Sequence, residues 1–164
     1  MNRFFVSGLL LLSAFAVPAQ KTESQQEINS STIVFVCEHG SARSVIAASH
    51  FNRLASEKGL TYRAVSRGKN PDTTIPATIK DALATDGLDV STWKPKAVTE
   101  EDMRKAGRVV TLGIELPSAK PTATDRLLEW SDIPAMSQSY DAVRKVIVQH
   151  VTELVQTLAA SKPQ

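Results

Sequence analysis

The sequence predicts one α/β domain built on a parallel sheet. Short apolar segments rich in β-branched residues alternate with longer segments of helical period between residues 32 and 160. Strands that alternate with helices in this way form parallel sheets, with right-handed crossovers between the strands. The chain has 164 residues, of which 42% are hydrophobic, so it is large enough to bury one core. A ligand of such a sheet binds beyond the carboxyl ends of its strands.

Four segments are expected as strands. Residues 32–36 form a continuous run of β-branched and aromatic side chains, typical of a strand that is buried on both faces. The second and third strands are expected at residues 62–66 and 108–112, where similar short apolar segments occur. The fourth is a short apolar stretch within residues 125–130.

Four further segments are expected as helices. Residues 41–58 have apolar side chains on one face and are followed by a glycine that stops a helix. A proline opens the second helix, over residues 76–87. Acidic residues follow a threonine cap at the start of the short third helix, over residues 99–107. Residues 140–158 keep an apolar helical period throughout and form the last helix.

The first 19 residues have the three regions of a secretory signal peptide. Arg3 gives a positive start, residues 4–17 are apolar, and small residues up to Ala19 suit cleavage after that position. The apolar run is shorter than the ~20 residues of a membrane-spanning helix, which disfavours an anchor. Residues 20–31 are polar and are expected to form a flexible leader to a domain over residues 32–160. We therefore expect export, to the periplasm or the medium, without stable membrane association after cleavage.

Composition narrows the partners that this domain is expected to have. The net charge is +2 and 22% of the residues are charged, which gives no reason to expect nucleic acid or an anionic membrane surface. The single cysteine excludes an internal disulfide and a cysteine-cluster metal site. No His/Glu spacing indicates a metal, so neither a metal nor an organic cofactor is expected. The oligomeric state is left open.

The segment around Cys37 carries the strongest chemical signal. Cys37 follows the first apolar run, and Arg43 and Ser44 stand at the start of the helical pattern. Backbone N–H groups that turn into such a loop favour an anion, as does the N-terminus of the next helix. The planar guanidinium of Arg43 can hold two oxygens of a tetrahedral oxyanion. We expect the whole loop to bind substrate: Glu38, His39, Gly40, Ser41, Ala42, Arg43 and Ser44.

The same loop would make Cys37 a nucleophile. A thiol attacks as its thiolate, which the loop amides, the helix and Arg43 would stabilise, and to which Ser44 can donate a hydrogen bond. The alternative is that Cys37 is a small buried hydrophobe at the end of a strand. The strand–loop–helix context and the spacing to Arg43 favour the nucleophile.

A leaving group also needs a proton donor, and Asp132 is the candidate. It follows the last expected strand and precedes Pro134, and it could later act as a base toward water. A turn residue near a proline is the alternative interpretation of Asp132. Asp125 and Asp141 are weaker candidates. Asp141 is more simply interpreted as an acid in the first turn of a helix.

Other polar residues each allow two interpretations. His39 is either an anion contact or a residue that fills the loop, since histidine does both. Arg67 and Lys69 either line the mouth of the pocket or form a solvated basic turn. His50 and His150 lie within expected helices and are more simply surface or packed residues than metal ligands.

Residues 37–44 resemble the phosphate loop of low-molecular-weight protein tyrosine phosphatases and of the arsenate reductases that share their fold. The resemblance covers nearly the whole expected domain. It includes Val65-Ser66-Arg67-Gly68 after the second strand, Gly87-Leu88-Asp89-Val90-Ser91 after a helix, and the segment from Trp130 to Pro134. It implies a four-stranded parallel sheet with helices on both faces and a phosphate loop after the first strand.

The sequence departs from the family pattern at four places. His39 and Gly40 stand where phosphatases usually have Gly-Asn, and His39 resembles a variant in some single-cysteine arsenate reductases. Ala42 occupies the position of the second loop cysteine. One residue separates Asp132 from Pro134, where the family has Asp-Pro. Residues 113–115 contain no cysteine, so a thioredoxin-coupled mechanism with internal resolving cysteines is excluded, whereas one with an external thiol is not.

The expected function is therefore that of a protein tyrosine phosphatase-like phosphomonoesterase. It would act through a cysteinyl-phosphate on Cys37, with Arg43 holding the phosphoryl group and Asp132 moving protons. Its substrate would be a phosphorylated protein or a small aryl phosphate, with arsenate as a further candidate. Two alternatives remain: an arsenate reductase that uses an external small thiol, and a non-catalytic oxyanion-binding module.

Overall fold

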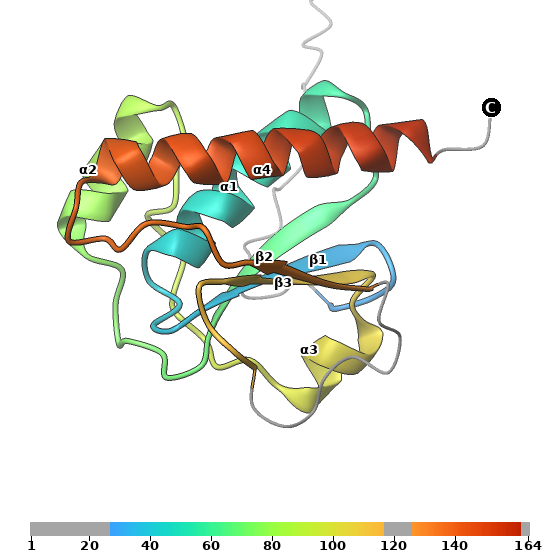
Figure 1. Ribbon diagram of the computed structural model, residues 1–164, viewed down its shortest axis with the longest axis horizontal. Coiled ribbons are helices and arrows are strands. Elements are labelled where there is room, and N and C mark those ends of the chain that lie inside the picture. The colour runs from blue at the N-terminus through green and yellow to red at the C-terminus, as the bar shows by residue number, and fades with distance from the viewer. Residues whose placement is uncertain (1–26, 117–125, 162–164) are drawn as a thin grey trace, which may run out of the picture.

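The structure is a computed structural model that describes residues 27–116 and 126–161. Its elements run in the order β1 (Thr32–Cys37), α1 (Arg43–Glu57), β2 (Arg63–Gly68), α2 (Ala77–Thr85), α3 (Glu100–Lys105), β3 (Arg108–Leu112), β4 (Leu127–Trp130) and α4 (Tyr140–Ala160) (Figure 1). The expected signal peptide and most of the expected leader lie outside the described residues. All eight expected elements in the described part of the chain are present.

The four strands form one parallel sheet in the order β2-β1-β3-β4. Because all strands point the same way, their carboxyl ends meet at one edge. Cys37 at the end of β1 is in register with Gly68 of β2, and Leu112 of β3 is in register with Trp130 of β4. The loops after all four strands therefore leave the sheet at the edge where ligands of such sheets bind.

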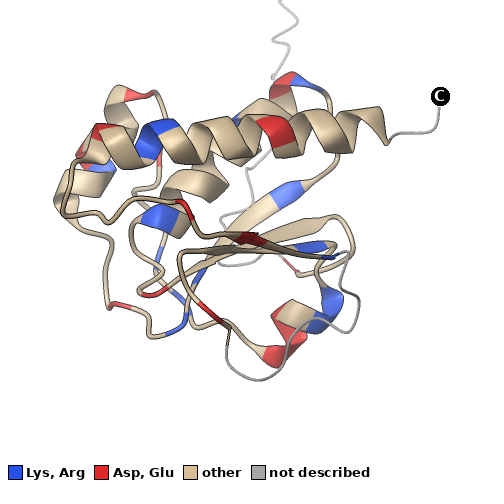
Figure 2. Cartoon of the chain, viewed as in Figure 1, with Lys and Arg blue, Asp and Glu red and all other residues tan. Residues whose placement is uncertain are grey.

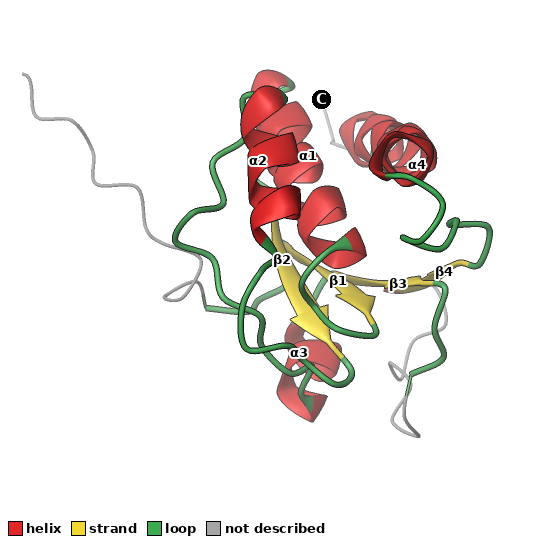
Figure 3. Ribbon diagram, turned by 90° about the vertical axis from the view of Figure 1, so that its left-hand side faces the viewer, coloured by secondary structure: helices red, strands yellow, loops and turns green. Residues whose placement is uncertain are grey.

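Helices cover both faces of the sheet, as expected. Figure 3 shows α1, α2 and α4 on one face and α3 on the other. The larger core lies under α1 and α4, where Phe35 of β1 contacts the rings of Phe51 and Trp130. The smaller core lies on the α3 face and includes Val34 and Val109. The alternation of β1 side chains between the two cores explains why its whole length is apolar.

Most element boundaries differ by a few residues from the expected ones, and two of these differences shape the region of the loop after β1. Helix α1 begins at Arg43 rather than at Ser41, because Ser41 stays in the preceding loop and its hydroxyl donates to Asp72. Strand β2 extends to Gly68 rather than ending at Ser66, because its pairing with β1 continues to the last residue of that strand. Sequence periodicity does not detect either contact, since both join residues far apart in the chain.

Arg67 has a different role from the two that the sequence allowed. Its side chain is buried, and its Nε lies 3.1 Å from Oδ2 of Asp102 in α3. The same carboxylate accepts a hydrogen bond from the backbone N–H of Thr99, so it also caps α3. Arg67 is therefore neither at the pocket mouth nor in a solvated turn. It is a buried link between β2 and the helix on the far face.

The charged residues are mixed over the molecule. Figure 2 shows lysines and arginines interspersed with aspartates and glutamates on both faces of the sheet. Within residues 27–116 and 126–161, no helix has the length and apolar character needed to cross a membrane.

Candidate active site

The thiol of Cys37 lies at the base of the loop between β1 and α1. The residue is 3% exposed, and its sulfur accepts a hydrogen bond from the backbone N–H of Gly40 at 3.3 Å. The hydroxyl oxygen of Ser44 lies 3.1 Å from the same sulfur. Two groups that follow Cys37 in the chain therefore turn back onto its sulfur, so the loop is curled around the thiol.

A chain of hydroxyl groups connects the thiol to the loop backbone. Ser44 Oγ lies 2.8 Å from Ser66 Oγ, and the Ser66 hydroxyl donates to the Gly40 carbonyl at 3.2 Å. With Ser66 donating to that carbonyl, Ser44 donates to Ser66, and the thiol can donate to Ser44. When Cys37 ionises, the Ser44 hydroxyl can rotate and donate to the sulfur instead. The pair of serines can thus satisfy either protonation state of the nucleophile.

Two glycines allow this loop to pack directly against β2. Gly40 has a φ of +62°, which an L side chain rarely adopts, and a Cβ there would lie 2.7 Å from the backbone nitrogen of Gly68. A Cβ on Gly68 would lie 2.8 Å from the backbone of Gly40. Neither backbone can move aside easily, so both positions require glycine and together they fix the shape of the loop.

Arg43 begins α1 and reaches the loop that follows β3. Its guanidinium packs against Gly113, where a Cβ would lie 2.7 Å from Arg43 Nη1. Within the described residues, no carboxylate forms an ion pair with Arg43. A half-buried guanidinium without an anionic partner suits an oxyanion ligand.

The segment after β2 runs beside the loop and adds residues that the sequence did not reveal. Its backbone N–H groups donate to three carbonyls of the loop: Lys69 to Cys37, Asn70 to Glu38 and Asp72 to His39. The Asp72 carboxylate accepts from the Ser41 hydroxyl and lies 3.6 Å from His39 Nδ1. Asp72 and Ser66 are the main additions, and only the pairing of β1 with β2 brings them to this place.

The structure thus brings together residues 37–44, the segment for which the sequence predicted substrate binding. Glu38 bonds to Asn70 at 2.7 Å, Ala42 precedes α1, and the remaining members make the contacts described above. A hollow of about 620 Å³ opens at the ends of β3 and β4; its described lining includes Gly113, against which Arg43 packs, but no residue of the loop itself. In the described part of the chain, no three metal-ligating side chains are grouped.

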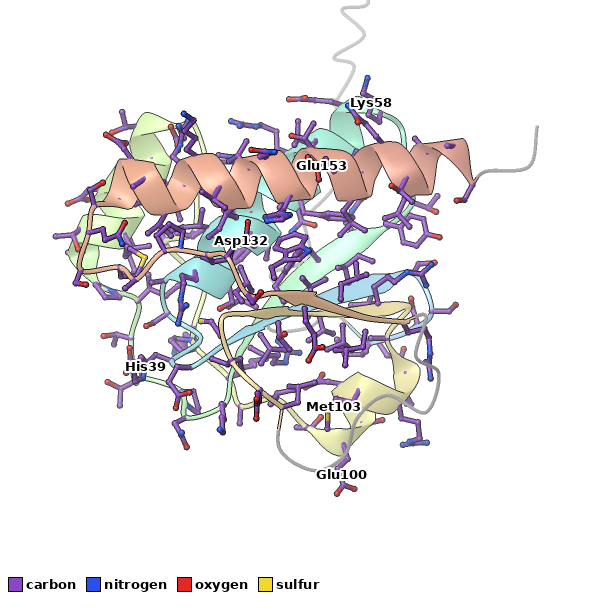
Figure 4. All side chains as sticks on the ribbon, in the orientation of Figure 1. His39, Lys58, Glu100, Met103, Asp132 and Glu153 are labelled. Atoms are coloured by element: carbon purple, nitrogen blue, oxygen red, sulfur yellow. The ribbon has the colours of Figure 1, made fainter. Side chains whose placement is uncertain are left out.

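Asp132 follows β4 at the same edge of the sheet, but its carboxylate is paired with a residue of α4. Its two carboxylate oxygens lie 2.8 and 2.9 Å from Nε2 of His150 in α4, and the His150 ring stacks on Trp130 with centroids 4.8 Å apart. In Figure 4, Asp132 lies close to α4, whereas His39 lies lower in the view, away from that helix. The hydrogen bond with His150 lowers the pKa of the Asp132 carboxyl. Of the weaker candidates, Asp141 is in the first turn of α4, and Asp125 lies outside the described residues.

Comparison with known proteins identifies the family. Residues 32–126, more than half of the chain, match the profile of the low molecular weight phosphotyrosine protein phosphatase family. The chain belongs to this family. The expected family and the fold that it implied are thereby confirmed.

Solved structures similar to this chain include both kinds of enzyme. An arsenate reductase from Archaeoglobus fulgidus is 30% identical, with a TM-score of 0.58, and the match covers 76% of this chain and 98% of that one. A low molecular weight protein tyrosine phosphatase from T. tengcongensis is 21% identical, with a TM-score of 0.65, over 80% and 99% of the two chains. A thioredoxin-dependent arsenate reductase from Corynebacterium glutamicum is also 21% identical, with a TM-score of 0.65, over 84% of this chain and 65% of its own. Family membership alone does not choose between the two activities.

Proposed function

We propose that this protein is a phosphomonoesterase that forms a cysteinyl-phosphate on Cys37. The observation that supports this best is the buried thiol at the base of the loop. Its sulfur faces a backbone N–H and the Ser44 hydroxyl, and Arg43 follows with no anionic partner in the described residues. These groups are those that hold a phosphoryl oxyanion and support attack on it.

In the proposed reaction, the Cys37 sulfur attacks phosphorus while the bond to the leaving oxygen breaks. The loop amides and the Arg43 guanidinium hold the non-bridging oxygens and stabilise the charge that spreads over them in the transition state. The Ser44 hydroxyl, 3.1 Å from the sulfur, stabilises the thiolate before attack and again when water releases phosphate. No step in this scheme needs a metal or an organic cofactor.

The part of Asp132 in this reaction stays a prediction. As a general acid it would have to be protonated, yet the hydrogen bond with His150 lowers its pKa and keeps it ionised near neutral pH. It would also have to leave the His150 ring to reach the loop. As a base toward water, Asp132 could stay ionised and would only have to leave the His150 ring.

We propose a phosphorylated protein or a small aryl phosphate as the substrate. The hollow at the carboxyl ends of β3 and β4 has room for a group of that size, and Gly113 in its lining packs against Arg43. The proposal places the protein outside the cytoplasm, on the basis of the signal peptide that the sequence predicts.

Hydrolysis of an aryl phosphate by the purified protein tests this proposal. The wild type is expected to turn over p-nitrophenyl phosphate, and the Cys37→Ser variant is expected to fold equally well but to show no turnover. Wild-type turnover that is no faster than that of Cys37→Ser would exclude catalysis by this thiol. Tight phosphate binding without any turnover would instead favour the oxyanion-binding module.

A second candidate is the reduction of arsenate with an external small thiol. The specific observation behind it is the 30% identity to the arsenate reductase from Archaeoglobus fulgidus. Because Cys37 is the chain's only cysteine, both further sulfur atoms would have to come from added thiol, which is oxidised to a disulfide as arsenate becomes arsenite. Arsenite formation that depends on added glutathione and on Cys37 would support this activity.

A further inference from the structure

We propose that His39, oriented by Asp72, donates the proton to the leaving group and later accepts one from the attacking water. The inference rests on the phosphatase reaction proposed above and assigns its proton transfers to a pair of residues on the phosphate loop. The sequence suggested His39 as either an anion contact or a residue that fills the loop, and Asp132 as the proton donor.

The first observation is the position of His39. It stands two residues after Cys37, in the loop whose backbone turns onto the thiol at Gly40. Its side chain is 61% exposed, so it is open to a substrate that enters from solvent. Nδ1 lies 3.6 Å from Asp72 Oδ1, and Nε2 has no hydrogen bond or ion pair with a described residue. One ring nitrogen thus faces a carboxylate while the other is free for substrate.

The second observation is that Asp72 is bound to the loop through both its backbone and its side chain. Its backbone N–H donates to the His39 carbonyl at 3.0 Å, and its carboxylate accepts a hydrogen bond from Ser41. A carboxylate that faces one nitrogen of an imidazole fixes the direction in which the other nitrogen points. Asp72 therefore meets the requirements of a positioning residue for His39.

The third observation is the contrast with Asp132. Both of its oxygens are bound to His150, on a helix that does not contribute to the loop. Figure 4 shows the labelled His39 and Asp132 well apart, with Asp132 close to α4. In the described structure, Asp132 is thus engaged by His150, whereas Nε2 of His39 has no hydrogen-bond or ion-pair partner among the described residues.

The proton balance of the reaction fits this pair. As the S–P bond forms and the P–O bond to the leaving group breaks, the proton on His39 Nε2 passes to the leaving oxygen, which departs as an alcohol or phenol. His39 is then neutral. When water attacks phosphorus, its proton passes to Nε2, the S–P bond breaks with its electron pair returning to sulfur, and inorganic phosphate leaves.

The dependence of the rate on the leaving group tests this inference. A good leaving group such as p-nitrophenolate departs without a proton, whereas phenolate departs poorly without one. Formation of the cysteinyl-phosphate is measured by rapid acid quench with p-nitrophenyl phosphate and with phenyl phosphate. For His39→Gln, we expect a loss on the order of a hundredfold to ten thousandfold with phenyl phosphate and a much smaller loss with p-nitrophenyl phosphate. Asp72→Asn should show the same selectivity to a smaller extent.

The matched control for Asp72→Asn is Asp81→Asn, an exposed carboxylate on α2 that should behave as the wild type. Equal losses with the two substrates in His39→Gln would overturn the inference, because they would indicate a role in binding or folding. The inference would also be overturned if Asp132→Asn, and not His39→Gln, lost much more activity with phenyl phosphate than with p-nitrophenyl phosphate. If the wild type forms no cysteinyl-phosphate with either substrate, the proposed function itself fails, and this inference fails with it.

Discussion

The protonation state of a single side chain, Cys37, decides the chemistry of the loop. The sulfur is buried, and buried charge is costly unless hydrogen bonds satisfy it. Gly40 supplies one such bond through its N–H, and Ser44 supplies another when its hydroxyl rotates. Ser66 Oγ lies 2.8 Å from Ser44 Oγ and can donate to it by turning from the Gly40 carbonyl, so the thiolate then has a second layer of partners.

Ser44→Ala should therefore slow catalysis without unfolding the protein. A hydrogen bond to a charged group contributes about 1.5–3 kcal/mol. Its loss should lower kcat/KM for p-nitrophenyl phosphate by about tenfold or more, since each 1.4 kcal/mol is roughly a factor of ten. Steady-state kinetics at neutral pH measure the effect.

The matched control is Ser49→Ala on the same helix. The Ser49 hydroxyl is also buried, but it donates to the Ile46 carbonyl of its own helix at 3.1 Å. This variant should keep the wild-type kcat/KM. Equal activity of Ser44→Ala and Ser49→Ala would contradict the role given to Ser44.

At the residue scale, the sequence revealed part of this site and missed the rest. Cys37, Arg43 and Ser44 could be predicted because their spacing is local and lies between a strand and a helix. Asp72 could not, because it lies 31 residues from the Ser41 hydroxyl that it accepts from. The bond between His150 and Asp132 likewise depends on how α4 packs beside β4.

Among the elements, the junction between β2 and the loop fixes the site most directly. The Gly68 backbone approaches Gly40 too closely for any side chain, and its N–H donates to the Lys96 carbonyl at 2.8 Å. Backbone held from both sides cannot shift to admit a methyl group. The sequence showed a turn with small residues here but not the direct contact that requires them.

Gly68→Ala should thus disturb both stability and catalysis. Overpacking of a closely packed site costs about 1–3 kcal/mol, and the displaced loop should lower kcat by at least about tenfold. Chemical denaturation and kinetics measure the two effects. Gly59→Ala is the control: a Cβ there meets no atom within 4 Å, so only its φ of +62° adds strain and kcat should not change. Normal kcat in Gly68→Ala would show that the loop does not depend on this contact.

A polar cluster under α4 joins three helices. Asp86 at the end of α2 bonds to Arg144 of α4 and faces His50 of α1, whose Nε2 lies 3.5 Å from Oδ2. Arg53 donates to His50 Nδ1 at 3.1 Å, so the neutral ring carries its proton on Nε2, toward Asp86. Burial of the ring, together with the charge of Arg53, lowers the pKa of His50 to about 4.

This cluster predicts a pH dependence of stability. The unfolded chain binds a proton at His50 near pH 6.5, whereas the folded chain does so only near pH 4. Stability is therefore complete above the unfolded pKa and is lost as pH falls toward the folded pKa, by up to roughly 3 kcal/mol. The free energy of unfolding of the wild type should fall more steeply over this range than that of His50→Gln.

On the scale of the whole molecule, the fold follows from features that are local in the sequence. The continuous apolar strand and the alternation of strands with helices suffice for a parallel sheet that is covered on both faces. The ends of the elements follow less well, because α1 and β2 are trimmed or extended by contacts with distant segments. Family membership agrees with the fold but does not distinguish phosphatase from arsenate reductase activity, which has to be measured.

Export is the prediction that concerns the whole chain most directly. The three regions in residues 1–19 predict cleavage after Ala19, so the mature protein should begin at Gln20. N-terminal sequencing of the protein recovered from the periplasm or the medium measures this. Recovery of the protein in the cytoplasm with Met1 or Asn2 at its start would contradict the prediction.

The most direct test of the central claim is to look for phosphate on Cys37 during turnover. The wild-type protein is mixed with p-nitrophenyl phosphate, quenched with acid within the first turnovers, digested and measured by mass spectrometry. We predict one phosphoryl group on the peptide that contains Cys37, which disappears once the substrate is consumed. Turnover with no phosphoryl group on this peptide, or with the group on another residue, would contradict the mechanism.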